Sequence, residues 1–297
     1  MKHSESSINV IINPTSGTKS KDYVIKCLKK LSREYDFHFF YTEYPHHATE
    51  IALESVQRSV RYVIVVGGDG TINEVARALV GTDTVLGIIP HGSGNGLARH
   101  LHISMNIARA IDIFKQNKVQ QIDYGIANGN LFFCTCGVGY DAEVSEKSLN
   151  QKKRGIMMYA KNMIDVFRNF KPESYRVTTS AGNFHGKAFT ITCANASQYG
   201  NNAYIAPNAD ICDGKMNISI LDPLSAVDIP RAALQMFTKR INDNPKLNEL
   251  ICCTASIERE TDGVMHLDGN AIYTSKNINV EIIHKGLCIG PIDSLKI

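Results

Sequence analysis

Residues 61–74 read Arg61-Tyr-Val-Ile-Val-Val-Gly67-Gly68-Asp69-Gly70-Thr71-Ile-Asn73-Glu74. The apolar, β-branched first half of this segment predicts a buried parallel strand, and the residues after it have the period of a helix. Thr71 and Glu74 have the spacing of a capping box, which predicts that the helix begins at Thr71. Glycines at a strand-to-helix turn let backbone N–H groups approach an anion, so the segment predicts phosphate binding.

Asp69 lies among these glycines. A lone carboxylate beside bound phosphates would be repelled unless a cation lay between them, so Asp69 indicates Mg²⁺ binding or proton transfer. The alternative is a tight turn in which Asp69 only caps the helix.

Two other apolar strands, at residues 8–12 and 84–90, end in turns of a similar kind. The first leads into Asn13-Pro-Thr-Ser-Gly17, which lacks the earlier glycine of a Walker motif, and the second leads into His91-Gly-Ser-Gly-Asn95-Gly96. Turns at the carboxyl ends of consecutive strands predict a ligand crevice in an open α/β sheet. A strand at 37–42 and helices at 49–57, 97–102 and 107–117 complete this half.

From residue 119 the pattern changes to short segments joined by turn residues. Strands are predicted at 119–127, 130–136, 175–180, 185–194 and 215–221, with hairpin turns at Asn128-Gly129 and Ala181-Gly182-Asn183. Two amphipathic helices, 152–170 and 225–240, interrupt them. Their apolar stripes favour core packing over the alternative, a flexible lining for an acyl chain.

Composition excludes several classes of protein. A chain of 297 residues suggests two domains, and a net charge of +3 is too small to indicate nucleic acid. Eight cysteines without a CxxC pair argue against structural zinc, and the first residues predict no secretory signal. No apolar run approaches the roughly 20 residues of a membrane span. We therefore expect a cytoplasmic protein that meets any lipid at a membrane surface.

Five motifs occur in order along nearly the whole chain: Asn13-Pro-Thr-Ser-Gly17, the Gly67–Glu74 turn, Pro90-His-Gly92-Ser93-Gly94-Asn95, Asp210-Ile-Cys-Asp213-Gly214-Lys215 and Leu267-Asp268-Gly269. The ordered set resembles the diacylglycerol kinase catalytic-domain family, which includes soluble bacterial lipid kinases and sphingosine kinases. The resemblance implies an open, mostly parallel α/β domain related to NAD kinase and phosphofructokinase at residues 1–122. It also implies a β-rich, sandwich-like lipid-substrate domain at 123–288, with residues 289–297 returning to the first domain.

The same resemblance implies ATP and Mg as cofactors and a lipid hydroxyl as phosphoryl acceptor. Asp123 would lie near the substrate; the equally good alternative is that it is only a turn residue at the end of a strand. The Asp213 side chain, with backbone oxygens of Asp210 and Lys215, would hold a structural Mg²⁺, and an ordinary Asp-Gly turn is the alternative. The implied nucleotide-binding residues are Asn13, Pro14, Thr15, Ser16, Gly17, Thr42, Gly67, Gly68, Gly70, Thr71, Asn73, Glu74, Gly92 and Ser93.

The chain departs from the family pattern at two places. Asn95-Gly96 replaces the Asn-Asp of several bacterial relatives, and Asn270 replaces the glutamate that acts as proton acceptor in relatives. Asn270 is neutral, so we predict Asp69 as the principal proton acceptor and Asp268 as an orienting residue in catalysis.

The sequence therefore predicts an ATP- and Mg-dependent lipid kinase acting on diacylglycerol or a sphingoid-type lipid. Alternatives are a NAD kinase-like small-molecule kinase and a non-catalytic nucleotide- or lipid-binding protein. A dinucleotide oxidoreductase is weaker, because Gly137-Val-Gly139-Tyr-Asp-Ala142 matches GxGxxA without a clear βαβ unit. Lys152, Lys153 and Arg154 are candidate membrane contacts or a solvated helix end. A homodimer is left open.

Overall fold

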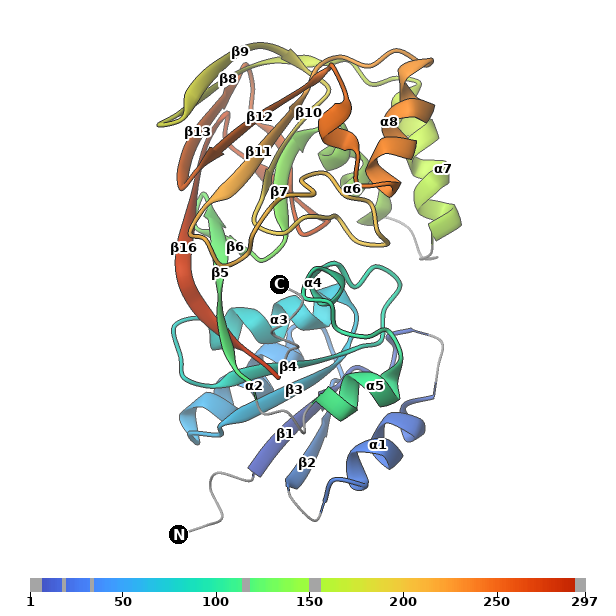
Figure 1. The fold of residues 1–297 in the computed structure, drawn as a ribbon, viewed down its shortest axis with the longest axis vertical. Coiled ribbons are helices and arrows are strands. Elements are labelled where there is room, and N and C mark those ends of the chain that lie inside the picture. The colour runs from blue at the N-terminus through green and yellow to red at the C-terminus, as the bar shows by residue number, and fades with distance from the viewer. Residues whose placement is uncertain (1–6, 18–19, 33–34, 114–117, 150–155, 292–297) are drawn as a thin grey trace. The chain divides into compact units, whose positions relative to one another are not determined.

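The computed structural model describes residues 7–17, 20–32, 35–113, 118–149 and 156–291 (Figure 1). The contacts divide the chain into two compact units, one holding the described residues of 1–122 and 285–297, the other those of 123–284. The chain passes from the first unit to the second within strand β5 (Gln120–Ala127) and returns within strand β16 (Asn277–Ile289).

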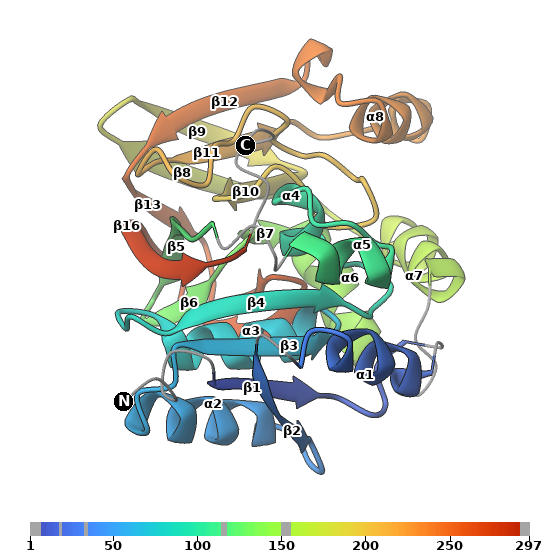
Figure 2. The same cartoon turned by 60° about the horizontal axis from the view of Figure 1, so that its bottom comes forward.

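The first unit is a parallel sheet with helices on both faces. Its elements are β1 (Ser7–Ile12), α1 (Lys21–Lys29), β2 (Asp36–Tyr41), α2 (His47–Gln57), β3 (Tyr62–Gly67), α3 (Asp69–Leu79), β4 (Val85–Pro90), α4 (Gly96–His100) and α5 (Ile107–Asp112). The strand order is β2-β1-β3-β4, and the end of β16 pairs in parallel with β4. Helices α1 and α5 cover one face and α2 and α3 the other (Figure 2). Both faces of β3 are thus covered, which explains its unbroken apolar run.

The second unit is built from two antiparallel sheets. Its further strands are β6 (Asn130–Phe132), β7 (Thr135–Gly139), β8 (Glu173–Thr179), β9 (Gly182–Ala188), β10 (Thr190–Ala194), β11 (Met216–Leu221), β12 (Leu247–Cys252), β13 (Thr254–Arg259), β14 (Gly263–Leu267) and β15 (Asn270–Thr274). One sheet has the order β12-β11-β10-β7-β14-β15, and the other contains β16-β13-β8-β9. Their inner faces share one apolar core, in which Val138 and Ile218 of the first sheet cluster with Val177 and Val280 of the second. This is a β-sandwich.

Three helices lie on the outer face of the six-stranded sheet. They are α6 (Tyr140–Leu149), α7 (Ile156–Phe167) and α8 (Asp228–Phe237), and a 3-10 turn, η2 (Ile241–Asp243), follows α8. Tyr140 of α6, Val166 of α7 and Ile229 of α8 pack in one cluster with Phe189 and Leu221 at the ends of the strands. The polar outer face of this sheet is therefore partly enclosed by helices.

The predicted fold class, an open α/β sheet followed by a β-sandwich, is confirmed. Two predicted strands each prove to be two, because the chain changes sheets within them. β9 pairs with β8, whereas β10, after Phe189, pairs with β7 and β11; likewise β6 pairs with β5 and β7 belongs to the other sheet. Helix α6 and the strands after Leu221 were not predicted.

The predicted capping box is wrong. Helix α3 begins at Asp69, two residues before Thr71, and its N-cap Gly68 has extended backbone and makes no side-chain capping bond. The Thr71 hydroxyl instead accepts a hydrogen bond from Asn13 Nδ2 at 2.8 Å. The first turn of α3 is thus left without a side-chain cap, a condition that favours an anion at this helix end.

Candidate functional site

Three polar turns follow β1, β3 and β4, which are neighbours in the parallel sheet. The first turn is organised by Asn13, whose Oδ1 accepts hydrogen bonds from the backbone N–H and the hydroxyl of Thr15, both at 2.9 Å. The Asn13 amide nitrogen donates to Thr71 in the first turn of α3. The structure thereby joins the first predicted nucleotide-binding turn to the second.

Asp69 joins the second turn to the third. Its Oδ2 accepts the backbone N–H of Asn95 at 2.7 Å, and its Oδ1 accepts that of Gly96 at 2.6 Å. A Cβ added at Gly92 would lie 2.5 Å from the Gly68 Cα. The two turns therefore approach so closely that only glycine fits at this position. Asp69 is therefore a tie between the two turns, in addition to any chemical role.

His91 follows β4 and is only 5% exposed. Neither of its ring nitrogens has a hydrogen-bond partner among the described residues, and a Cβ at Gly17 would collide with it. A buried polar group without a partner costs about 1–3 kcal/mol, so a polar ligand between these turns would be favoured. The glycine-lined turns, the uncapped N-terminus of α3 and this imidazole fit a phosphate-bearing nucleotide.

The remaining nucleotide-binding candidates lie around these turns. Thr42 follows β2 and donates its backbone N–H to Ile12, at the end of β1. Asn73 is buried within α3, and the Glu74 carbonyl accepts the Thr49 hydroxyl. All of the predicted nucleotide-binding residues belong to the first unit, whereas the substrate, metal and Asp268 candidates belong to the second.

Asp268 lies between β14 and β15. Its Oδ2 accepts the backbone N–H of Phe133 at 2.8 Å, and its Oδ1 accepts those of Cys134 and Thr135 at 2.7 and 2.9 Å. It therefore fixes the connection between β6 and β7, where the chain changes sheets.

Asp123 is fully buried at the start of the second unit. Its Oδ1 lies 2.9 Å from Nδ1 of His284, and its Oδ2 accepts the backbone N–H of Gly214 at 2.7 Å. The predicted substrate residue is thus enclosed by the protein, and the side chain that reaches the surface here is His284, which is 49% exposed.

Gly214 belongs to the predicted metal-binding turn. Asp210 Oδ1 accepts the N–H of Cys212, Asp213 Oδ1 accepts that of Lys215, and Gly214 has a φ of 74°. Among the described residues no group of three or more His, Cys, Asp or Glu side chains is placed to share a metal ion. The predicted site has only one such side chain, the Asp213 carboxylate, and its other two ligands are backbone carbonyls, so this result does not bear on it. Carboxylate and carbonyl oxygens are hard donors, which fit Mg²⁺.

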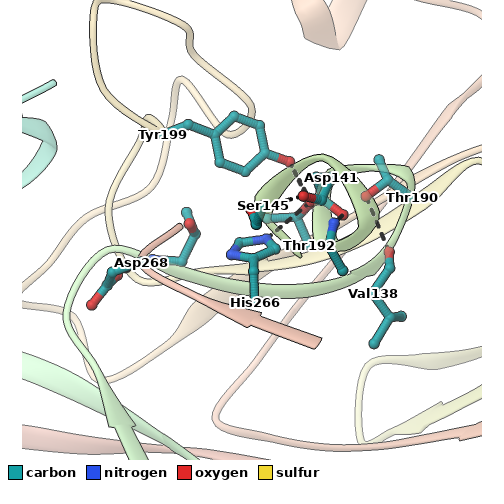
Figure 3. A network of polar contacts seen from close by, with 10 residues as sticks. Val138, Asp141, Ser145, Thr190, Thr192, Tyr199, His266 and Asp268 are labelled. Carbon is teal, nitrogen blue, oxygen red and sulfur yellow. Dashed lines mark hydrogen bonds and ion pairs between the residues drawn. The ribbon is translucent and has the colours of Figure 1, made fainter. Parts of the chain in front are cut away.

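The sequence did not predict a buried polar network around Asp141, at the start of α6 (Figure 3). Asp141 Oδ2 receives Thr192 Oγ1 at 3.0 Å, Tyr199 OH at 2.9 Å and His266 Nε2 at 3.0 Å. Burial raises the pKa of Asp141, but the charge and hydrogen bond of His266 and the Tyr199 hydroxyl outweigh it, so that this pKa lies below its usual value.

Gly137 is the signal in the sequence that points to this network. A Cβ at Gly137 would lie 2.9 Å from His266 Nε2 and 3.2 Å from Asp141 Oδ2. The GxGxxA pattern therefore makes room for an imidazole beside a carboxylate, in a sheet-to-helix connection whose strand is antiparallel to its neighbours.

Comparisons with known proteins place each unit in a family. The model of the diacylglycerol kinase catalytic domain matches residues 7–127, and that of the YegS C-terminal NAD kinase beta sandwich-like domain matches residues 134–283. A diacylglycerol kinase of Bacillus subtilis (strain 168) is 28% identical to this chain, over 79% of this chain and 80% of its own length.

Solved structures show the same fold. That of a diacylglycerol kinase from Bacillus anthracis strain Sterne has a TM-score of 0.77 at 20% identity and covers 98% of both chains. That of an NAD kinase from Archaeoglobus fulgidus, in complex with ATP, has a TM-score of 0.54 at 11% identity and covers 96% of this chain and 94% of its own.

Proposed function

Because the chain belongs to the diacylglycerol kinase catalytic-domain family, we propose that it is an ATP- and Mg²⁺-dependent lipid kinase. The acceptor hydroxyl oxygen bonds to the γ-phosphorus of ATP, the bond from that phosphorus to the β-phosphate oxygen breaks, and ADP leaves. The pair of glycine turns held together by Asp69 is the observation that carries the proposal. Phosphoryl transfer requires positioning and charge stabilisation above all, which preformed N–H groups can supply.

The nucleotide phosphates would bind at the turns after β1, β3 and β4, against the uncapped N-terminus of α3. Gly68, Gly70 and Ser93 offer backbone or hydroxyl donors there, and Asn13 holds the first turn against the second. The His91 imidazole, which has no partner among the described residues, would donate to or accept from the bound nucleotide.

Labelled ATP offered with diacylglycerol, a sphingoid base, NAD and a sugar phosphate tests this function. Label in a lipid supports the proposal, and label in NAD would make the protein a NAD kinase-like small-molecule kinase. If no acceptor is labelled and Asn270→Glu restores transfer, the native chain is a nucleotide- or lipid-binding protein on a kinase fold.

Mg²⁺ would be held by the Asp213 carboxylate and by backbone oxygens of Asp210 and Lys215, where it would supply a structural cation for the turn. We expect Mg²⁺ without nucleotide to raise the melting temperature, because an ion that binds only the folded state stabilises it by about 2.7 kcal/mol at 100 times its Kd. Asp213→Ala should lose this increment, measured by scanning calorimetry. Lys215→Ala, which keeps the backbone oxygen, is the control. An equal Mg²⁺ response in wild type and Asp213→Ala would rule out the site.

The lipid acceptor would be met at a membrane surface. Among the described residues, no helix is both long and apolar enough to cross a bilayer. The predicted contacts Lys152, Lys153 and Arg154 lie outside the described residues. In the described part of the chain, α8 exposes Leu234 by 65% and Phe237 by 58%, and apolar side chains of this kind enter the lipid interface.

Replacing Leu234 and Phe237 together by serine is expected to weaken sedimentation with anionic vesicles, because their apolar area would no longer be buried in lipid. Ile251→Ser on β12, another exposed apolar side chain, is the matched control. Equal vesicle binding by all three proteins would argue against α8 as the contact surface.

A further inference from the structure

The turn that follows β2 continues a row of turns along one edge of the first unit's sheet. β2, β1, β3 and β4 are parallel, so their carboxyl ends lie at the same edge. Thr42, directly after β2, donates its backbone N–H to the Ile12 carbonyl at the end of β1 at 3.0 Å. Asn13 donates its backbone N–H to the Val66 carbonyl of β3 at 3.1 Å. The residues after β2 therefore adjoin the first of the turns proposed to hold the nucleotide phosphates.

Helix α2, which follows this turn, is also tied to the N-terminal part of α3. The Thr49 hydroxyl in the first turn of α2 donates to the Glu74 carbonyl at 3.0 Å. Because α3 begins at Asp69 and a helix rises about 1.5 Å per residue, this bond lies about 8 Å along α3 from its first residue. The start of α2 is thus close to the helix end proposed to face the phosphates, and all of these residues belong to the first unit.

Tyr44 and His47 form a stacked aromatic pair in the turn between β2 and α2. Their ring centroids are 4.3 Å apart and the ring planes differ by 6°. Each ring is fixed by a hydrogen bond: His47 Nδ1 accepts the backbone N–H of Glu43 at 3.1 Å, and the Tyr44 hydroxyl donates to Glu50 Oε2 at 2.7 Å. Because both rings are already held in place, a ligand that stacked on them would lose little side-chain entropy on binding.

This pair presents an aromatic surface to solvent. Tyr44 is 50% exposed although one face of its ring lies on His47. Phe37 and Phe39 of β2, by contrast, pack against the core of the unit. A pair that served only to pack α2 against the sheet would gain more from burial than from exposure. A fixed, exposed aromatic ring beside phosphate-binding turns is suited to a nucleobase, because every base has a π-face that stacks on such a ring.

We propose that Tyr44, held in place by His47, is the stacking platform for the base of the bound nucleotide. The proposal rests on the proposed function, because the row of turns would hold the phosphates of the same nucleotide. It assigns the base to a side chain of the turn in which the sequence had pointed only to Thr42. Stacking of this kind tolerates any base, so the platform supplies affinity for the nucleotide without by itself selecting adenine.

Calorimetric titration in the presence of Mg²⁺, with ATP and with tripolyphosphate, tests the platform, because tripolyphosphate has the charged part of ATP but no base. We expect Tyr44→Ala to weaken ATP binding about 5- to 150-fold, the range for loss of one base–aromatic contact, and to leave tripolyphosphate binding unchanged. Tyr44→Phe keeps the ring and should bind ATP more tightly than Tyr44→Ala. Tyr273→Ala, at an exposed tyrosine of the second unit, is the matched control and should equal wild type.

The outcomes separate this proposal from the proposed function. Equal ATP affinity of wild type and Tyr44→Ala would overturn the platform and leave nucleotide binding standing. Weaker binding of both ATP and tripolyphosphate by Tyr44→Ala would mean that Tyr44 shapes the phosphate turns instead of contacting the base, which also overturns the platform. A wild-type protein that binds neither compound would overturn the proposed function as well.

A fluorescence measurement gives a second readout that does not depend on activity. The chain contains no tryptophan, so Tyr44→Trp introduces a single indole at the platform. We expect ATP to quench the fluorescence of this indole by stacking on it, and tripolyphosphate to leave it unchanged. Unchanged emission at an ATP concentration that saturates the variant in calorimetry would place the base away from residue 44 and would overturn the proposal.

Discussion

Asp69→Ala is expected to lower the rate of phosphoryl transfer at least about 10²-fold in saturating Mg²⁺-ATP while the protein remains folded. The alanine leaves the N–H groups of Asn95 and Gly96 without their acceptor, and the second and third turns lose their tie. Misplacement of reacting groups by about 1 Å can cost 10²-fold in rate, and loss of an acid–base residue costs roughly 10²–10⁴-fold. The measurement is kcat with the labelled lipid, alongside a urea unfolding curve.

Asp83→Ala is the matched control, because Asp83 is an exposed carboxylate of the same unit in the turn before β4. It should leave kcat unchanged. Asp69→Asn is a useful second variant. Its amide oxygen can accept one of the two backbone N–H groups, but its amide nitrogen is a donor and cannot accept the other. Near wild-type turnover of Asp69→Ala would remove Asp69 from the mechanism, both as a tie and as a proton acceptor.

The glycine turns were predictable from sequence because their signals are local. β3 and β4 are continuous apolar runs, and each ends at glycines within a few residues. The bond from Asp69 to Asn95 joins residues 26 apart, and no local pattern encodes it. The prediction of a capping box was wrong for the same reason, because the Thr71 hydroxyl accepts a hydrogen bond from Asn13, 58 residues earlier.

Two of the strands after Leu221, β12 and β15, lack the alternating pattern that predicts a strand, whereas β13 and the first half of β16 show it and were overlooked. β12 and β15 are the two edges of the six-stranded sheet, and neither alternates cleanly between buried and exposed residues. An edge strand is partly solvated, so its sequence need not show period two.

The Asp141 network escaped prediction because Asp141 and His266 are 125 residues apart. Only Gly137 hinted at it, and that glycine had suggested a nucleotide motif.

Asp141→Ala is expected to lower the free energy of unfolding by about 3–5 kcal/mol. The substitution leaves His266, Tyr199 and Thr192 without the oxygen on which all three converge, and breaking one side of a buried pair has an effect of this size. His266 already has one ring nitrogen without a partner among the described residues, so it cannot turn to a ready substitute. The measurement is urea unfolding followed by circular dichroism at pH 7.

Asp165→Ala supplies the control for Asp141. Asp165 lies on α7 of the same unit and pairs with Lys147 at 3.3 Å, but both side chains are partly solvated. A surface pair of this kind contributes about 0–1 kcal/mol, so the control should unfold near the wild-type urea midpoint. If both substitutions lower the free energy of unfolding equally, burial does not explain the stabilising effect of the Asp141 network.

The effect of Asp141 should also depend on pH. Its pKa is lower in the folded protein than the value of about 3.9 in an unfolded chain, so the unfolded state binds the proton more readily. The stability that Asp141 contributes is therefore fully present above about pH 4 and is lost as the pH falls through the lower, folded-state pKa. Asp141→Asn removes the titrating group and should unfold at a lower urea concentration than wild type at pH 7. That difference should shrink below about pH 4, where wild type becomes protonated too. A difference that stays constant down to acid pH would mean that the negative charge of Asp141 does not contribute to the free energy of unfolding.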